Sequence, residues 1–278
     1  MRTKPRSNVE CKSTVDYWDE NWRRASGQED RPHLSERKGY FWRRMERALE
    51  KCFDGLDTGN SSLIEIGAGA SEWLPYLHHR FGFSVAGLDY SDVGCKRAQD
   101  NLTRTSTPGN IHHADMFNPS AGLHQQFDVV VSFGLVEHFS DTAAAVAACA
   151  AYAKPGGLIA TLIPNMSGLY GWFYRVFDRK VYDIHVPLTL KALRQAHRDA
   201  GLDLVLDEHI LGVPGVIDGQ RVEPVFIRRW VRKLVFRVSS MTWALEERGW
   251  GVPENAFTSP YMICAARKPA LPTGLSAG

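Results

Sequence analysis

Short apolar runs alternate with helix-like segments through the middle of the chain. The runs are rich in Val, Ile and Leu, which favours strands that are buried on both faces. Strands separated by helices of about 10 to 14 residues are typical of βαβ units and a parallel sheet. The predicted strands are residues 62–66, 84–89, 110–115, 128–132, 157–163 and 202–210.

Capping residues mark the helices that are expected between these strands. Ser71 and Ser91 stand at helix starts, and Gly82 and Gly201 stand at helix ends. An Ala-rich segment is expected to remain helical until Pro155-Gly156 stops it. The predicted helices are residues 71–82, 91–102, 141–154 and 188–201.

A last apolar run, residues 259–268, follows a long intervening segment and could return as an antiparallel strand. The predicted fold class is therefore α/β, a Rossmann-like three-layer α/β/α sandwich with a mostly parallel seven-stranded sheet. The expected organisation is an aromatic-rich helical cap (1–48), a main domain (49–268) with an insertion (211–258), and a disordered Pro/Gly/Ser-rich tail (269–278).

Composition narrows the possible settings and partners. The 278 residues carry a formal net charge of +2, which does not indicate nucleic-acid binding. The five cysteines are scattered, and His112-His113 on one strand would point to opposite faces, so no metal site is predicted. The polar N-terminus does not resemble a signal peptide, and no run is long enough to span a bilayer, so a cytoplasmic setting is expected. The oligomeric state is left open.

The stretch LIEIGAGASEW, residues 63–73, places a glycine turn directly after the first strand. A dinucleotide site would require a third glycine where Glu72 stands, and the acid Glu65 would repel a nearby pyrophosphate. The same acid would suit a cofactor that carries an ammonium group. A glycine turn without any ligand is the remaining alternative.

Acidic residues also end the next two strands. Asp89 follows the glycine turn at the spacing of a residue that accepts hydrogen bonds from ribose hydroxyls. Asp115 is placed to accept from an exocyclic adenine amine, with Met116 against the ring. A helix cap or a turn is the alternative role for each acid taken alone.

Together with SFGLVEHF (132–139) and AKPGG (153–157), these motifs resemble the class I S-adenosylmethionine-dependent methyltransferases, in particular the branch with ubiquinone-biosynthesis O-methyltransferases and sugar methyltransferases. The resemblance covers most of residues 60–210. It implies S-adenosyl-L-methionine as the cofactor and a small-molecule acceptor. The cofactor-binding residues that it implies are Glu65, Gly67, Ala68, Gly69, Asp89, Tyr90, Asp115, Met116, Phe133 and Gly134. The aromatic residues Trp18 and Trp22 lie outside the core strands and are separately expected to close over the cofactor.

Methyl transfer to a hydroxyl benefits from a base, and two histidines are candidates. His138 lies just past the fourth strand, and His185 follows an aromatic loop. The alternative for His138 is a structural role, in which it holds Glu137 or a neighbouring loop. Trp18 and Trp22 are four residues apart on one helical face, which also fits ordinary packing of the cap.

Residues 225–245 predict a basic amphipathic helix. It is interpreted either as a substrate lid or as an element that contacts a membrane surface or a lipid-like substrate. The function predicted is methyl transfer to a small molecule, most simply at a hydroxyl. The alternatives are an NAD-dependent oxidoreductase or epimerase, and a binding module that resembles a methyltransferase but is catalytically silent.

Overall fold

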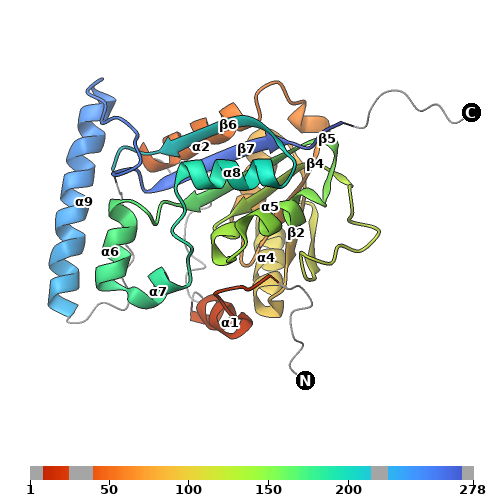
Figure 1. Ribbon diagram of the computed structural model, residues 1–278, viewed down its shortest axis with the longest axis horizontal. Helices are drawn as coiled ribbons and strands as arrows, with labels where there is room; N and C mark the ends of the chain where they lie inside the picture. Colours follow the sequence, from red (N-terminus) through yellow and green to blue (C-terminus); the bar gives the residue numbers. More distant parts are fainter. Residues whose placement is uncertain (1–8, 25–39, 214–224, 271–278) are drawn as a thin grey trace, which may run out of the picture.

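A seven-stranded sheet forms the centre of the computed structural model, which describes residues 9–24, 40–213 and 225–270. The strand order is β3-β2-β1-β4-β5-β7-β6. The first five strands in this order are parallel, and β7 runs antiparallel to both of its neighbours, which confirms the predicted fold class (Figure 1). The strands are β1 (Ser62–Ile66), β2 (Ser84–Asp89), β3 (Gly109–His113), β4 (Phe127–Phe133), β5 (Ala153–Pro164), β6 (Asp203–Ile210) and β7 (Tyr261–Arg267).

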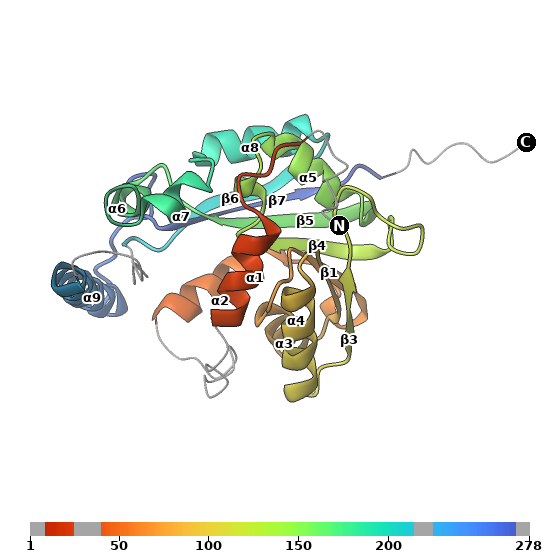
Figure 2. The ribbon, with the colours of Figure 1, turned by 90° about the horizontal axis from the view of Figure 1, so that it is seen from below.

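Helices cover both faces of the sheet because its central strands are apolar on both sides. Leu63 and Ile64 are adjacent in β1, both fully buried, and they belong to different core clusters. One cluster packs under α2 (Tyr40–Cys52), α3 (Trp73–Phe81) and α4 (Asp92–Arg104). The other packs under α5 (Thr142–Ala150) and α8 (Leu190–Asp199), as Figure 2 shows.

The predicted capping residues stand at the helix ends. The Ser91 hydroxyl accepts a hydrogen bond from the Gly94 amide at the start of α4. Thr189, which was not predicted as a cap, does the same for Ala192 at the start of α8. Gly82 ends α3 with φ +85°, a left-handed conformation that favours glycine.

Some of the predicted boundaries are wrong. The Ala-rich helix α5 ends at Ala150 rather than at 154, because the amides of Gln126 and Phe127 both donate to the Tyr152 carbonyl and draw the chain into β5. The third strand ends at His113 rather than at 115, because the Asp115 carboxylate accepts from the Phe117 amide and closes a turn.

The N-terminal region contributes α1 (Val15–Arg24) and α2. The segment before α1 lies beside the 3₁₀ turn η3 (Val136–His138), where Cys11 forms a β-bridge with Phe139. The expected cap boundary at residue 48 falls inside α2, which continues to Cys52. The predicted tail lies outside the described residues from position 271 onward.

Three helices gather beyond the β6 end of the sheet: α6 (Leu169–Phe177), α7 (Arg179–Asp183) and α9 (Val225–Glu247) (Figure 1). Helix α9 is the predicted basic helix, and its Trp243 ring lies 5.6 Å from that of Tyr40 in α2. The side chains of Arg228, Arg229 and Arg232, which belong to this predicted basic helix, lie outside the described part of the structure. Among the helices that the structure describes, none has the length and apolar content to cross a bilayer.

Candidate functional site

The carboxyl ends of the parallel strands bring the predicted site residues to one edge of the sheet. Glu65 lies near the end of β1, Asp89 ends β2 and Phe133 ends β4. Helix α1 lies across this edge beside α4, in front of the sheet in Figure 2. The site is therefore bounded by the strand ends on one side and by the N-terminal helix on the other.

The glycine turn after β1 folds back onto the end of β2. The amides of Gly67 and Ala68 both donate to the Leu88 carbonyl. Gly67 has φ +80°, and a Cβ there would lie 3.0 Å from a methyl carbon of Leu135. A larger residue at position 67 would be strained and crowded, so the turn requires glycine at this point.

Asp89 is bound into the glycine turn through its carboxylate. One oxygen accepts from the Gly69 amide at 2.8 Å, and the other accepts from the Ser91 amide at 2.7 Å. Burial raises the pKa of Asp89, while the amides of Ser91, Gly69 and Tyr90 oppose that effect. A carboxylate offers about four acceptor positions, so these amides do not saturate it and it can still accept from a ribose hydroxyl.

Glu65 is almost completely buried beside this turn, and the Ser71 hydroxyl donates a hydrogen bond to its carboxylate. Burial raises the pKa of Glu65 to about 8, which the Ser71 hydrogen bond opposes and the Asp89 charge reinforces. A cation at this position would keep the carboxylate ionised and offset its desolvation. The geometry thus suits the ammonium group that the sequence analysis expected there.

Trp22 covers the glycine turn. A Cβ on Gly69 would lie 2.8 Å from the Trp22 indole nitrogen and 3.0 Å from the nearer Asp89 oxygen. The indole N–H is buried and has no hydrogen-bond partner among the residues that the structure describes. This unsatisfied donor lies beside the Asp89 carboxylate and the glycine backbone. A bound group with acceptor atoms, such as a nucleoside, would satisfy it.

Trp18 links this turn to the histidines. Its ring stacks on Trp22 at 5.5 Å, as expected for residues on one helical face, and meets the His138 ring edge-on at 5.2 Å. Its indole nitrogen donates to the Ser13 hydroxyl. Helix α1 therefore contacts both the cofactor side of the candidate site and its histidine side.

The other predicted cofactor residues lie around the same edge of the sheet and differ in how deeply they are buried. Met116 is buried and Asp115 is partly exposed, while the Tyr90 side chain follows β2 and is 36% exposed. Phe133 stacks on Trp73 at 4.7 Å. Gly134 has φ +70° at the start of the loop that carries η3.

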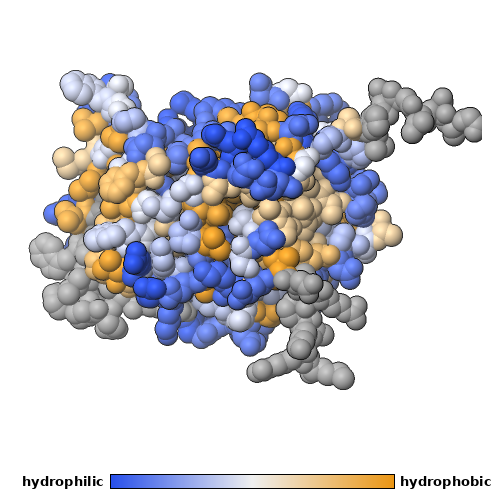
Figure 3. All heavy atoms as spheres, viewed as in Figure 1, coloured by the Kyte–Doolittle hydropathy of each residue, from blue (hydrophilic) through white to orange (hydrophobic). Residues whose placement is uncertain are grey.

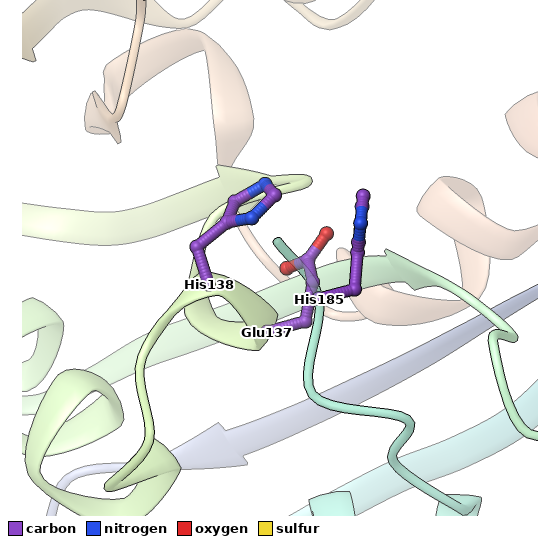
Figure 4. Close-up of side chains that lie close together, drawn as sticks. All are labelled: Glu137, His138 and His185. Atoms are coloured by element: carbon purple, nitrogen blue, oxygen red, sulfur yellow. The ribbon is translucent and has the colours of Figure 1, made fainter. Parts of the chain in front are cut away.

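Glu137, His138 and His185 form a buried cluster at the histidine side of the site. One potential ligand atom from each residue lies within 4.8 Å of the others. Figure 4 shows the Glu137 carboxylate between the two imidazole rings, whose centroids are 4.5 Å apart. Two elements distant in the sequence supply the cluster: η3 after β4 and the loop after α7.

The protonation of both rings follows from their hydrogen bonds. Nδ1 of His138 lies 2.7 Å from the Ile184 carbonyl oxygen, and Nδ1 of His185 lies 2.6 Å from that of Val181. A carbonyl only accepts, so both Nδ1 atoms carry the proton and both Nε2 atoms carry a lone pair. Burial lowers the pKa of His138, and burial together with His138 lowers that of His185 to about 3.

A structural role was the alternative expected for His138, and part of it is observed. Its ring forms a hydrogen bond with the Ile184 carbonyl in the neighbouring loop. From the sequence, Ser71 was expected only to cap a helix, and no chemical role was expected for Glu137. The Ser71 hydroxyl donates to Glu65, and both oxygens of Glu137 are buried with no hydrogen bond to another residue in the described ranges. The sequence did contain a signal for Glu137, because an acidic residue within the mostly apolar stretch FGLVEHF suggests a functional role.

The chain matches the model of the family described as "Methyltransferase domain" over residues 33–207, which is more than half of its length. It is 30% identical over 115 residues to the ubiquinone biosynthesis O-methyltransferase of Paramagnetospirillum magneticum, covering 41% of this chain and 42% of that protein. With its counterpart in Rhodopseudomonas palustris strain TIE-1 it shares 27% over 159 residues, covering 55% of this chain and 60% of that protein. The chain thus spans about half the length of the curated relatives it matches.

The fold has counterparts among solved structures. The geranyl diphosphate C-methyltransferase from Streptomyces coelicolor A3(2), solved with Mg²⁺, geranyl diphosphate and S-adenosyl-L-homocysteine, has a TM-score of 0.54 at 15% identity and covers 90% of this chain and 98% of that one. At this identity the match shows the shared fold. The family match, the sheet order and the acidic glycine turn agree, and the chain therefore belongs to the methyltransferase domain family, the class I S-adenosylmethionine-dependent methyltransferases.

Proposed function

We propose that this protein transfers the methyl group of S-adenosylmethionine to a hydroxyl group of a small-molecule acceptor. The observation that carries the cofactor half is the glycine turn, where Asp89 retains free lone pairs beside the unsatisfied indole N–H of Trp22. The acceptor half rests on Glu137, His138 and His185 at the same edge. The relatives named as O-methyltransferases support a hydroxyl acceptor.

In this proposal Asp89 and Tyr90 hold the ribose, Glu65 faces the ammonium group, and Asp115 with Met116 contacts the adenine. Gly67, Ala68 and Gly69 let the cofactor approach the backbone, and Phe133 and Gly134 lie near the sulfonium. The bound cofactor supplies an activated methyl group. The protein's own part is to orient the two reactants and to exclude water, which can contribute roughly 7–11 kcal/mol in well-oriented models.

The chemistry is a single displacement in which atoms and charge balance. The acceptor oxygen forms a bond to the methyl carbon while the S–CH₃ bond breaks and its electron pair stays on sulfur. The hydroxyl proton leaves the acceptor oxygen, and the neutral Nε2 of His138 or His185 is the nearest base that the cluster offers. The products are the methyl ether, S-adenosylhomocysteine and one proton.

The test is a turnover assay with methyl-deuterated S-adenosylmethionine and a panel of phenols, catechols, sugars, amines and thiols. Mass spectrometry then identifies the atom that receives the label. A labelled ether supports the proposal. Labelled amine, thioether or carbon products would contradict the hydroxyl assignment, and S-adenosylhomocysteine binding without turnover on any acceptor would favour the catalytically silent module.

Trp22 provides a direct optical test of the cofactor position. Because its indole lies against Gly69, a bound nucleoside must displace it or contact it. We expect S-adenosylhomocysteine to change the tryptophan emission of the wild-type protein in a saturable way, and Trp22→Phe to remove most of that change. Trp172→Phe is the matched control, since Trp172 is 53% exposed on α6, and it should keep the change. A signal that survives in Trp22→Phe would place the cofactor elsewhere.

The proposal extends to a lipid-like acceptor or a membrane surface that meets α9. Leu234, Val238, Met241 and Leu245 recur at helical spacing and are 45–68% exposed. The exposed Lys233 and Arg237 flank this apolar face. Figure 3 shows apolar residues gathered at the end of the molecule where α6 and α9 lie. Such a face beside basic side chains is typical of helices that lie in the membrane interface.

Sedimentation with anionic liposomes measures this contact. We expect the wild-type protein to sediment at low salt, and Leu234→Glu with Met241→Glu to lower the bound fraction several-fold, because two charges would enter the apolar boundary. Val205→Glu, at a 49% exposed position on β6, is the control and should bind normally. Equal binding of all three proteins would leave α9 as a substrate lid over the site, the other proposed role of the insertion.

A further inference from the structure

We propose that Glu137, His138 and His185 form a binding site for one divalent transition-metal cation. The three residues supply one carboxylate and two imidazoles, the donor types that bind Zn²⁺, Mn²⁺ and Fe²⁺ in proteins. Their potential ligand atoms lie within 4.8 Å of one another, so small side-chain rotations would bring all three to one ion. This proposal departs from the sequence expectation that the chain has no metal site.

The isolation of the Glu137 carboxylate is the first argument. Glu137 is 1% exposed, and no other residue that the structure describes forms a hydrogen bond with either of its oxygens. Desolvating an unpaired carboxylate costs several kcal/mol, so buried acids are normally paired with a cation or hydrogen-bonded. A divalent ion would supply that missing partner.

The orientation of the two imidazoles is the second argument. Each ring gives its Nδ1 proton to a backbone carbonyl, of Ile184 for His138 and of Val181 for His185. This is the arrangement found around metal-ligating histidines, because the hydrogen bond fixes the tautomer and turns the lone pair of Nε2 to the ion. Both rings are thus held in the neutral form that a cation requires.

The surroundings of the cluster are compatible with a bound cation. Lys12 is the cationic side chain recorded beside it, and its ammonium group donates to the His185 carbonyl at 3.1 Å, away from the ring nitrogen lone pairs. Trp18 flanks His138, so the ion would enter next to α1. A Cβ on Gly134 would lie 3.6 Å from a Glu137 carboxylate oxygen, so the loop before η3 passes close to this carboxylate.

Three protein ligands leave at least one coordination position open. Structural zinc sites are closed by four protein ligands, whereas sites with three keep a position for water or substrate. This part rests on the proposed function: the acceptor oxygen would occupy the open position, and the cation would stabilise the oxygen anion as its proton passes to water. The imidazoles would then act as ligands and not as the base.

The test measures metal binding separately from catalysis. The full-length protein is stripped with a chelator and titrated by calorimetry with Zn²⁺, Mn²⁺ and Mg²⁺. We expect about one equivalent of Zn²⁺ or Mn²⁺ to bind, more tightly than Mg²⁺, and to raise Tm. Glu137→Gln and His185→Gln should weaken binding at least about 100-fold. Removing a residue that only orients a metal ligand already lowers metal affinity by about 10- to 100-fold, and removing the ligand itself should cost at least as much. His124→Gln, at an exposed histidine, should bind normally.

Two outcomes would overturn the proposal. Absence of Zn²⁺ and Mn²⁺ binding in wild-type protein that still binds S-adenosylhomocysteine would remove the metal site and leave the proposed function intact. Undiminished binding in Glu137→Gln and His185→Gln would place the ion elsewhere. If these variants do not fold, pulsed electron paramagnetic resonance of the Mn²⁺-loaded wild-type protein decides: couplings to imidazole nitrogen support the site, and their absence contradicts it.

Discussion

Replacing Asp89 with asparagine lowers the affinity for S-adenosylhomocysteine by about 100-fold, because it removes the charge from hydrogen bonds worth about 1.5–3 kcal/mol each. Asparagine has the same shape and keeps one acceptor oxygen, so it can still receive one of the two backbone amides from Gly69 and Ser91. Most of the loss should therefore appear in cofactor binding. Equilibrium binding of S-adenosylhomocysteine to both proteins measures the effect.

Asp92→Asn is the matched control. Asp92 lies three residues further along, in the first turn of α4, and its exposed carboxylate pairs with Lys96. Removing that charge should leave cofactor affinity within about two-fold, since exposed pairs contribute little. A wild-type affinity in Asp89→Asn, or an equal loss in both variants, would show that Asp89 does not hold the cofactor.

Replacing Gly69 with alanine has the second large effect. The new methyl group would lie 2.8 Å from the Trp22 indole nitrogen and 3.0 Å from the Asp89 carboxylate, so at least one of them must move. Crowding of this kind costs about 1–3 kcal/mol, which corresponds to roughly 5- to 150-fold in cofactor affinity when the displaced groups belong to the site. Calorimetry with S-adenosylhomocysteine measures the loss.

Gly122→Ala controls for the general cost of adding a methyl group to a loop. A Cβ at Gly122 meets nothing within 4 Å, so its substitution should change neither binding nor Tm appreciably. Circular dichroism should show that both variants keep the native secondary structure. If Gly69→Ala binds S-adenosylhomocysteine as tightly as wild type, the cofactor does not rest on this turn.

The sequence predicted the sheet well because its central strands are apolar on both faces. The observed limits of β1 and β2 coincide with the predicted runs at 62–66 and 84–89. Strand β5 begins earlier than predicted, at Ala153, because it pairs with Phe127 across a register shift. The helix propensity of the Ala-rich segment led to a predicted helix that was too long. Hydrogen bonds to the Tyr152 carbonyl end the helix earlier, and local composition does not encode such tertiary pairing.

The site was predictable on its cofactor side and only partly on its acceptor side. Glu65, Gly67 and Asp89 follow strand ends, so their convergence follows from the parallel sheet. The buried cluster depends on a loop that brings His185 to η3, with a hydrogen bond between residues 46 positions apart. Sequence reasoning named both histidines as separate candidates, but their contact with an unpaired Glu137 required the fold.

The proposed function depends first on cofactor binding, and titration of the wild-type protein with S-adenosylhomocysteine and, separately, with NAD tests it most directly. We expect calorimetry to show one molecule of S-adenosylhomocysteine bound per chain and no heat with NAD, since Glu65 would repel a pyrophosphate at the turn. Binding of NAD without S-adenosylhomocysteine binding, or of neither ligand, would contradict the account.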